Sequence, residues 1–149
     1  MTDARAAGNA IQSAVDAFGR LDLLVNNAGY ANVNSIEDMA AEDFREQIET
    51  NFFGVVNVTR AALPVFRTQR DGHIIQISSV GGRGAKPGLS AYRSAKWAVG
   101  GFSEVLAKEV GPLGIKVTVV EPGGIRTDFS GSSMRVGAVR PDYQKLWEQ

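Results

Sequence analysis

The sequence contains no cysteine and only one histidine, His73. These absences exclude disulfide bonds, thiolate nucleophiles and metal sites built from cysteine or from several histidines. Neither sign of charge is in excess, because 16 Lys and Arg residues balance 16 Asp and Glu residues. A formal net charge of zero gives no long-range attraction to nucleic acid or to an anionic membrane, so we expect neither as a partner.

Long hydrophobic runs are also absent. No apolar stretch approaches the length of a membrane span, and the first ten residues, MTDARAAGNA, are too polar for a signal peptide, so we expect a cytoplasmic protein. The chain has 149 residues, of which 44% are hydrophobic and 21% charged. This is enough for one domain with a substantial core, and residues 1–149 are predicted to form a single domain.

Strand-like and helix-like patterns alternate along the chain. Short apolar runs that end in turn residues predict buried strands, and apolar residues at helical spacing predict helices. Their alternation predicts the α/β class, with a parallel sheet and helices on its faces. The predicted strands are 21–29, 73–79 and 116–124. The first predicted helix begins after the N-cap Asp3 and ends at Gly19. The other predicted helices are 41–69, with a bend or break at Pro64, then 90–110, and a short one near 142–148.

Each predicted strand ends in polar or glycine residues. The endings are Asn-Asn-Ala-Gly at 26–29, Ser-Ser at 78–79 and Glu-Pro-Gly-Gly at 121–124. In parallel α/β sheets, ligands bind at the carboxyl ends of the strands. The sequence therefore predicts a functional site along this edge of the sheet.

The segment SAYRSAKW at 90–97 places Tyr92 four residues before Lys96, on one face of a predicted helix. A free tyrosine has a pKa of about 10 and accepts protons poorly at neutral pH, but a nearby ammonium stabilises the phenolate and lowers that pKa. The spacing alone is weak evidence, because a surface lysine beside a half-buried tyrosine produces the same pattern.

The motifs NNAG, ISS, YRSAK and PGGIRT, in this order and spacing, closely resemble the short-chain dehydrogenase/reductase family. The resemblance covers nearly all of residues 3–128. It implies a three-layer, Rossmann-like, doubly wound parallel sheet. It also implies hydride transfer between NAD or NADP and a small alcohol or carbonyl substrate, and a homo-oligomer formed through helices 41–69 and 90–110.

The resemblance also assigns roles to individual residues. Tyr92 would be the general acid/base, and Lys96 would lower its pKa and bind the nicotinamide ribose. Ser79, thirteen residues before Tyr92, would hold the substrate oxygen; Ser78 is the competing choice, since adjacent strand residues face opposite sides. Asn51 matches a helix asparagine that anchors a water in the proton relay, or else bonds back to the helix backbone. The implied cofactor-binding residues, besides Tyr92 and Lys96, are Asn27, Ala28, Gly29, Pro122, Gly123, Ile125 and Thr127.

One family motif is missing. The pyrophosphate-binding turn T-G-x-x-x-G-x-G does not occur, and neither does G-x-G-x-x-G. The glycine-rich segment 81–88 lacks P-loop spacing and is expected to line the site, while Asn26 is expected to brace neighbouring strands. The resemblance thus implies an incomplete sheet, without the first βαβ units, that exposes apolar faces and edges. A second hypothesis follows: a non-catalytic family remnant that acts as a binding or dimerisation module.

Overall fold

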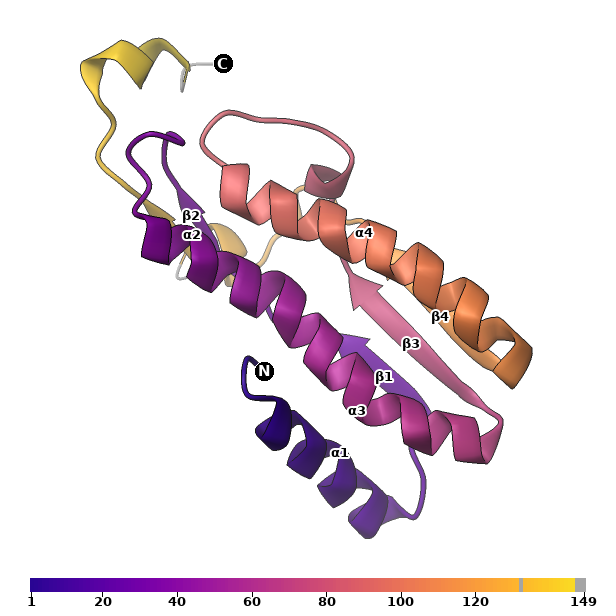
Figure 1. Cartoon of the computed structure of the whole chain (residues 1–149). Helices are drawn as coiled ribbons and strands as arrows, with labels where there is room; N and C mark the ends of the chain where they lie inside the picture. Colours follow the sequence, from indigo (N-terminus) through magenta and orange to yellow (C-terminus); the bar gives the residue numbers. More distant parts are fainter. Residues whose placement is uncertain (132, 147–149) are drawn as a thin grey trace.

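A three-stranded parallel sheet with the order β1-β3-β4 forms the centre of the fold (Figure 1). The computed structural model describes residues 1–131 and 133–146. Its main elements are α1 (Ala4–Phe18), β1 (Leu23–Asn26), β2 (Ala31–Val33), α2 (Ala41–Ile48), α3 (Gly54–Gln69), β3 (Gly72–Ile77), α4 (Ser90–Val110), β4 (Ile115–Val120) and β5 (Met134–Val136). The α/β class and the parallel sheet are confirmed, as are the three predicted strands, each shorter than predicted.

Two short strands were not predicted. β2 and β5 form a separate parallel pair in which Ala31 lies opposite Met134 and Val33 opposite Val136. Each strand has three residues, too few for a pattern of alternation, and the partners lie about a hundred residues apart in sequence. The helix predicted near 142–148 is a 3-10 helix over Pro141–Leu146, and residues 147–148 lie outside the described part of the chain.

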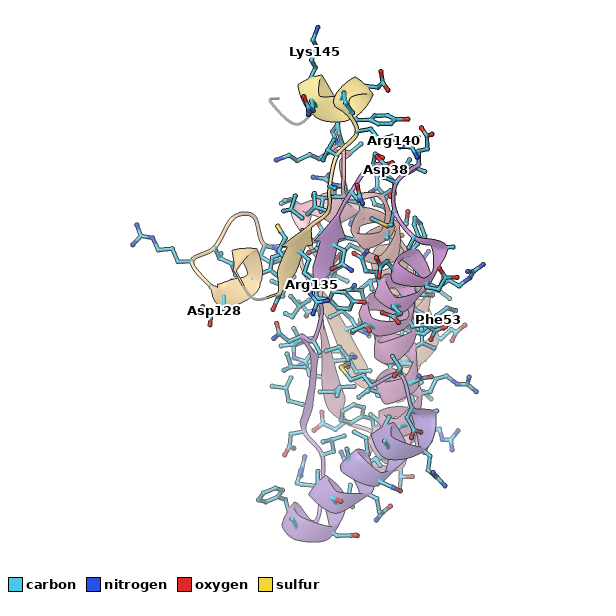
Figure 2. The ribbon with its side chains drawn as sticks, turned by 90° about the vertical axis from the view of Figure 1, so that its left-hand side faces the viewer. Asp38, Phe53, Asp128, Arg135, Arg140 and Lys145 are labelled. Atoms are coloured by element: carbon cyan, nitrogen blue, oxygen red, sulfur yellow. The ribbon has the colours of Figure 1, made fainter. Side chains whose placement is uncertain are left out.

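All three long helices, α1, α3 and α4, lie on the same side of the sheet (Figures 1 and 2). Leu24 and Ile74 are buried beneath them, whereas Leu23 and Val25 on the opposite face are each 48% exposed. β1, which the sequence predicts as a buried strand, is therefore buried on one face only. The described residues contain two of the three layers that the resemblance implies, the sheet and one helix layer. The core consists of Ile11, Leu24, Ala62, Phe66, Ile74, Leu106, Val110 and Ile115.

The first helix begins and ends where the sequence predicts. Asp3 Oδ1 accepts hydrogen bonds from Arg5 N at 2.8 Å and Ala6 N at 3.2 Å, which caps the N-terminus. Gly19 ends the helix with a left-handed φ of 77°, a conformation that glycine adopts without strain. Ile11 on this helix reaches the core, whereas Phe18 in its last turn is 80% exposed.

The long helix predicted over 41–69 is interrupted, but not at Pro64. A π-helical turn at Glu49–Phe53 separates α2 from α3, and Pro64 lies inside the continuous helix α3. Pro64 is on the exposed side of α3, where water can replace the backbone hydrogen bond that a proline removes. Of the two predicted outcomes at Pro64, a bend or a break, the break is therefore wrong. No helix within the described ranges is both long and apolar enough to cross a membrane.

Candidate active site

The structure brings the predicted pair Tyr92 and Lys96 together at the carboxyl end of β3. Both lie on the inner side of α4; the residue exposure is 9% for Tyr92 and 4% for Lys96. Lys96 Nζ donates a hydrogen bond to the Ile77 carbonyl at 2.8 Å and lies 5.7 Å from the centroid of the Tyr92 ring. The ammonium is therefore a close neighbour of the phenol, one helical turn away.

The environment of Lys96 perturbs its titration. Burial lowers the pKa of Lys96 from 10.5 to about 8, because the charged ammonium loses its hydration. Among the described residues, no carboxylate forms an ion pair with Lys96. At neutral pH the ammonium still carries its proton, and a cation held by a backbone carbonyl stands beside Tyr92.

The two serines that follow β3 have different partners. Ser78 is buried, and its hydroxyl donates to the Lys96 carbonyl at 3.1 Å. Ser79 is half-buried, and its Oγ accepts a hydrogen bond from Gly81 N at 3.0 Å. A Cβ placed on Gly81 would lie 3.2 Å from Ser79 Oγ and 3.5 Å from Tyr92 Cε1. Ser79 and the edge of the Tyr92 ring therefore flank Gly81.

Asn51 lies fully buried in the π-helical turn. Its Nδ2 donates to the carbonyls of Tyr30 and Gln47, both at 2.9 Å, and its Oδ1 accepts from Tyr30 N at 3.1 Å. The bond to Gln47 is the return to the helix backbone that the sequence left open as an alternative. Gly29 packs against this amide: a Cβ there would overlap Asn51 Oδ1 and lie 3.7 Å from Lys96 Nζ.

Asn26 braces the sheet, as the resemblance implies. Its Nδ2 donates to Gln76 Oε1 on β3 at 2.9 Å and to Thr59 Oγ1 on α3 at 3.0 Å. All three side chains are buried, so these hydrogen bonds satisfy the Asn26 Nδ2 group, which would be costly to leave without partners, whereas Asn26 Oδ1 has no hydrogen-bond partner among the described residues. Asn27 and Ala28 follow β1 directly and are exposed.

The segment after β4 lies beside the end of β3. Val80 N donates to the Pro122 carbonyl at 3.1 Å, which places Pro122 next to Ser79. Gly123 and Ile125 are exposed. Thr127 is exposed too, and its Oγ1 accepts a hydrogen bond from Phe129 N at 3.3 Å.

Phe129 was missed by the sequence reasoning. Its ring centroid lies 5.5 Å from that of Tyr92, with the ring planes tilted by 50°. Phe129 belongs to a 3-10 turn, Asp128–Ser130, and Figure 2 shows Asp128 on the side of the sheet away from the helices. The only sequence signal was an aromatic residue soon after Thr127, because a single turn has no periodicity that could place it against Tyr92.

Two hollows of the surface are lined by residues other than Tyr92 and Lys96. One, of about 340 Å³, is next to β2, β5 and α2, where Figure 2 shows Arg135. The other, of about 230 Å³, lies between α3 and the end of α4. Within the described residues no cluster of three or more His, Asp or Glu side chains could hold a metal ion. The candidate site is thus a polar edge of the sheet with a buried Tyr–Lys pair.

Comparison with known proteins agrees with this arrangement. The profile of the short chain dehydrogenase family matches residues 1–135. The chain therefore belongs to the short-chain dehydrogenase family. The structure of a short-chain dehydrogenase from Streptomyces avermitilis superposes with a TM-score of 0.90 at 38% identity, over 97% of this chain and 54% of that one. NAD⁺-bound xylitol dehydrogenase superposes with a TM-score of 0.80 at 31% identity, over 82% of this chain and 47% of the other.

Curated relatives give the same family. Oxidoreductase BOA17 of Botryotinia fuckeliana is 57% identical over 144 residues, which are 97% of this chain and 53% of the relative. The 3-ketodihydrosphingosine reductase of Bacteroides thetaiotaomicron is 42% identical over 130 residues, 87% of this chain and 48% of the relative. The chain spans about half the length of these relatives.

Proposed function

We propose that this chain carries the proton-transferring part of an oxidoreductase that moves a hydride between NAD or NADP and an alcohol or carbonyl substrate. The observation that carries the proposal is the buried Tyr92–Lys96 pair at the end of β3, with Lys96 Nζ 2.8 Å from the Ile77 carbonyl. Membership of the family supports the reaction type. One similar structure is that of an NAD⁺-bound xylitol dehydrogenase, and one relative is a 3-ketodihydrosphingosine reductase, which supports the cofactor and substrate classes.

In this mechanism Tyr92 holds the mobile proton. In the direction of reduction, the Tyr92 hydroxyl donates its proton to the substrate oxygen, and Ser79 Oγ hydrogen-bonds the same oxygen. The Lys96 ammonium stabilises the phenolate that remains, which lowers the cost of the transfer at neutral pH. In the reverse direction the phenolate accepts the proton of the alcohol. Asn51, whose amide is held by its bonds to Tyr30, is proposed to anchor a water in the relay that returns a proton to the Tyr92 phenolate.

A bound nicotinamide cofactor would supply or accept the hydride. One feature of the sheet edge fits such a group. Gly123 and Ile125, which follow β4, are exposed, so polar backbone groups there can meet a planar amide. The residues proposed to hold the cofactor are Asn27, Ala28, Gly29, Tyr92, Lys96, Pro122, Gly123, Ile125 and Thr127.

The test is Tyr92→Phe, with Tyr143→Phe as the matched control. Turnover is followed through oxidation of NADH or NADPH with a panel of carbonyl compounds. Phenylalanine keeps the ring but cannot transfer a proton, so turnover should fall by roughly 10²–10⁴-fold. Cofactor binding should be largely retained, because the other proposed cofactor contacts are unchanged. Tyr143 hydrogen-bonds Glu37 at the surface, and its substitution should change turnover little. Normal turnover in Tyr92→Phe would refute the proposal.

A second candidate is a non-catalytic module that binds or dimerises. The observation that favours it is the uncovered sheet face with Leu23 and Val25, together with exposed Trp97 on α4 and exposed Phe53 beside α3 (Figure 2). We infer that copies of the chain associate through α2, α3 and α4. Titration with NADH and NADPH distinguishes the candidates: micromolar binding favours the enzyme, and a folded oligomer that binds neither favours the module.

A further inference from the structure

The side chains of Ser78 and Lys96 each form a hydrogen bond with the main chain at or next to the other residue. The Lys96 side chain donates to the carbonyl of Ile77, the residue before Ser78, at 2.8 Å. The Ser78 side chain donates to the Lys96 carbonyl at 3.1 Å. Since Ser78 and Lys96 are both almost fully buried, the two bonds form a reciprocal link between the end of β3 and the middle of α4.

This link has no spare room around it. Gly82 lies in the short 3-10 turn after β3, and a Cβ on Gly82 would lie 3.0 Å from both the Lys96 carbonyl oxygen and Ser78 Oγ. Ser78 N also donates to the Val120 carbonyl at 2.8 Å, so the serine itself is held by β4. Rotation or sliding of α4 at Lys96 would have to break the Ser78 bond or push into Gly82.

Tyr92 lies one turn before Lys96 on the same face of α4. A change in the rotation of α4 at Lys96 therefore also moves the Tyr92 phenol relative to Ser79 at the end of β3. The Ser78 hydroxyl itself is engaged with the Lys96 carbonyl. Its effect on chemistry would pass through the placement of Lys96 and Tyr92.

We propose that Ser78 is a positioning residue, whose hydrogen bond to the Lys96 carbonyl sets the rotation of α4 and so keeps the Lys96 ammonium and the Tyr92 hydroxyl in reach of each other. The part of this inference that concerns turnover rests on the proposed oxidoreductase function. The part that concerns Lys96 does not, because the placement of its ammonium can be measured without substrate.

The experiment compares Ser78→Ala and Ser78→Thr with the control Ser103→Ala. Ser103 is a buried serine on the same helix whose hydroxyl donates at 2.7 Å to the Val99 carbonyl of its own helix, so its loss leaves the link to β3 intact. The titration of Lys96 is followed by NMR on lysine-labelled chain, with the signal assigned by its absence in Lys96→Met. Turnover and its pH profile are measured in parallel.

Ser78→Ala should let the ammonium reach water, so the Lys96 pKa should rise toward its ordinary value. Turnover should fall by roughly 10- to 100-fold, mainly in kcat, with a shifted pH profile. Ser78→Thr, which keeps the hydroxyl, should restore both readouts, and Ser103→Ala should change neither. If Ser78→Ala does not fold, Ser78→Cys keeps the volume and weakens the donor, and the same shifts are expected.

The proposal is overturned if the Lys96 titration in the folded Ser78 variant matches that of Ser103→Ala. Absence of turnover in the unmodified chain would count against the proposed oxidoreductase function alone, since the Lys96 titration would still report on positioning. The positioning role of Ser78 and the oxidoreductase function can therefore be refuted independently of each other.

Discussion

Gly29 offers the sharpest test of how the site is packed. Its φ is not in the left-handed region, so the backbone does not require glycine there. The requirement is space, because a Cβ would overlap Asn51 Oδ1. We predict that Gly29→Ala displaces the Asn51 amide and destabilises the fold.

The size of the effect follows from the three hydrogen bonds of Asn51. Two of them join its amide to the backbone of Tyr30, and the third goes to the Gln47 carbonyl. A net hydrogen bond is worth roughly 0.5–1.5 kcal/mol, and a buried polar group left without a partner costs about 1–3 kcal/mol. Losing the two bonds to Tyr30 should therefore lower the free energy of unfolding by about 2–4 kcal/mol.

A double-mutant cycle separates this mechanism from general damage. In an Asn51→Ala background no amide occupies the space, so Gly29→Ala should cost less than about 1 kcal/mol there, a coupling of about 2 kcal/mol. Equilibrium urea unfolding followed by circular dichroism measures all four chains. The control is Gly8→Ala in α1, where a Cβ meets nothing within 4 Å and should stabilise the helix slightly. Equal costs of Gly29→Ala in the two backgrounds would refute the reasoning.

Two further predictions concern stability. Because burial lowers the pKa of Lys96 to about 8, the unfolded chain binds a proton that the folded chain lacks between about pH 8 and pH 10.5. The free energy of unfolding should therefore rise with pH across this window, by about 3 kcal/mol in total, relative to that of Lys96→Met. If the two chains showed the same slope of unfolding free energy against pH, the burial of a charged lysine would be contradicted. Gly114 has a φ of 83° and faces the Arg70 carbonyl, so Gly114→Ala should cost at least about 1–2 kcal/mol in thermal or urea unfolding. Gly111→Ala, where a Cβ meets nothing within 4 Å, should be nearly neutral, and equal costs at the two positions would contradict the steric explanation.

Much of the fold could be predicted because its signals are local. The cap at Asp3 and the left-handed Gly19 depend on residues within one turn, and the structure confirms both. The interruption of 41–69 could not be predicted in the same way. The π-helical turn accompanies hydrogen bonds from Asn51 to Tyr30, a contact between segments about twenty residues apart that no local propensity encodes.

In the candidate site, too, features with a local signal could be predicted, and features that depend on tertiary packing could not. The Tyr92–Lys96 spacing and the polar ends of the strands are visible in the sequence, and their meeting at one edge follows from parallel topology. The hydrogen-bond partners of Ser78 and Ser79, by contrast, could not be predicted from the sequence. Period-two alternation says that adjacent side chains diverge, but only the packing of α4 against the turn after β3 shows that Ser78 faces the Lys96 carbonyl. Phe129 reaches Tyr92 through an irregular segment with no pattern at all.

Several contacts among the described residues place Tyr92 and Lys96. Ile77 and Ser78 hold Lys96, and Gly81 lies between Ser79 and the Tyr92 ring. The pyrophosphate-binding turn, by contrast, is not found in the sequence. The contacts that hold the Tyr92–Lys96 pair are therefore formed without that turn. It follows that Lys96 should show its lowered pKa in this chain even without cofactor, while turnover should be limited by the affinity for NADH or NADPH rather than by the Tyr92–Lys96 pair. The prediction is supported if turnover is measurable only at cofactor concentrations far above those that the longer relatives need. It is contradicted if Lys96 titrates at its ordinary pKa in the folded chain.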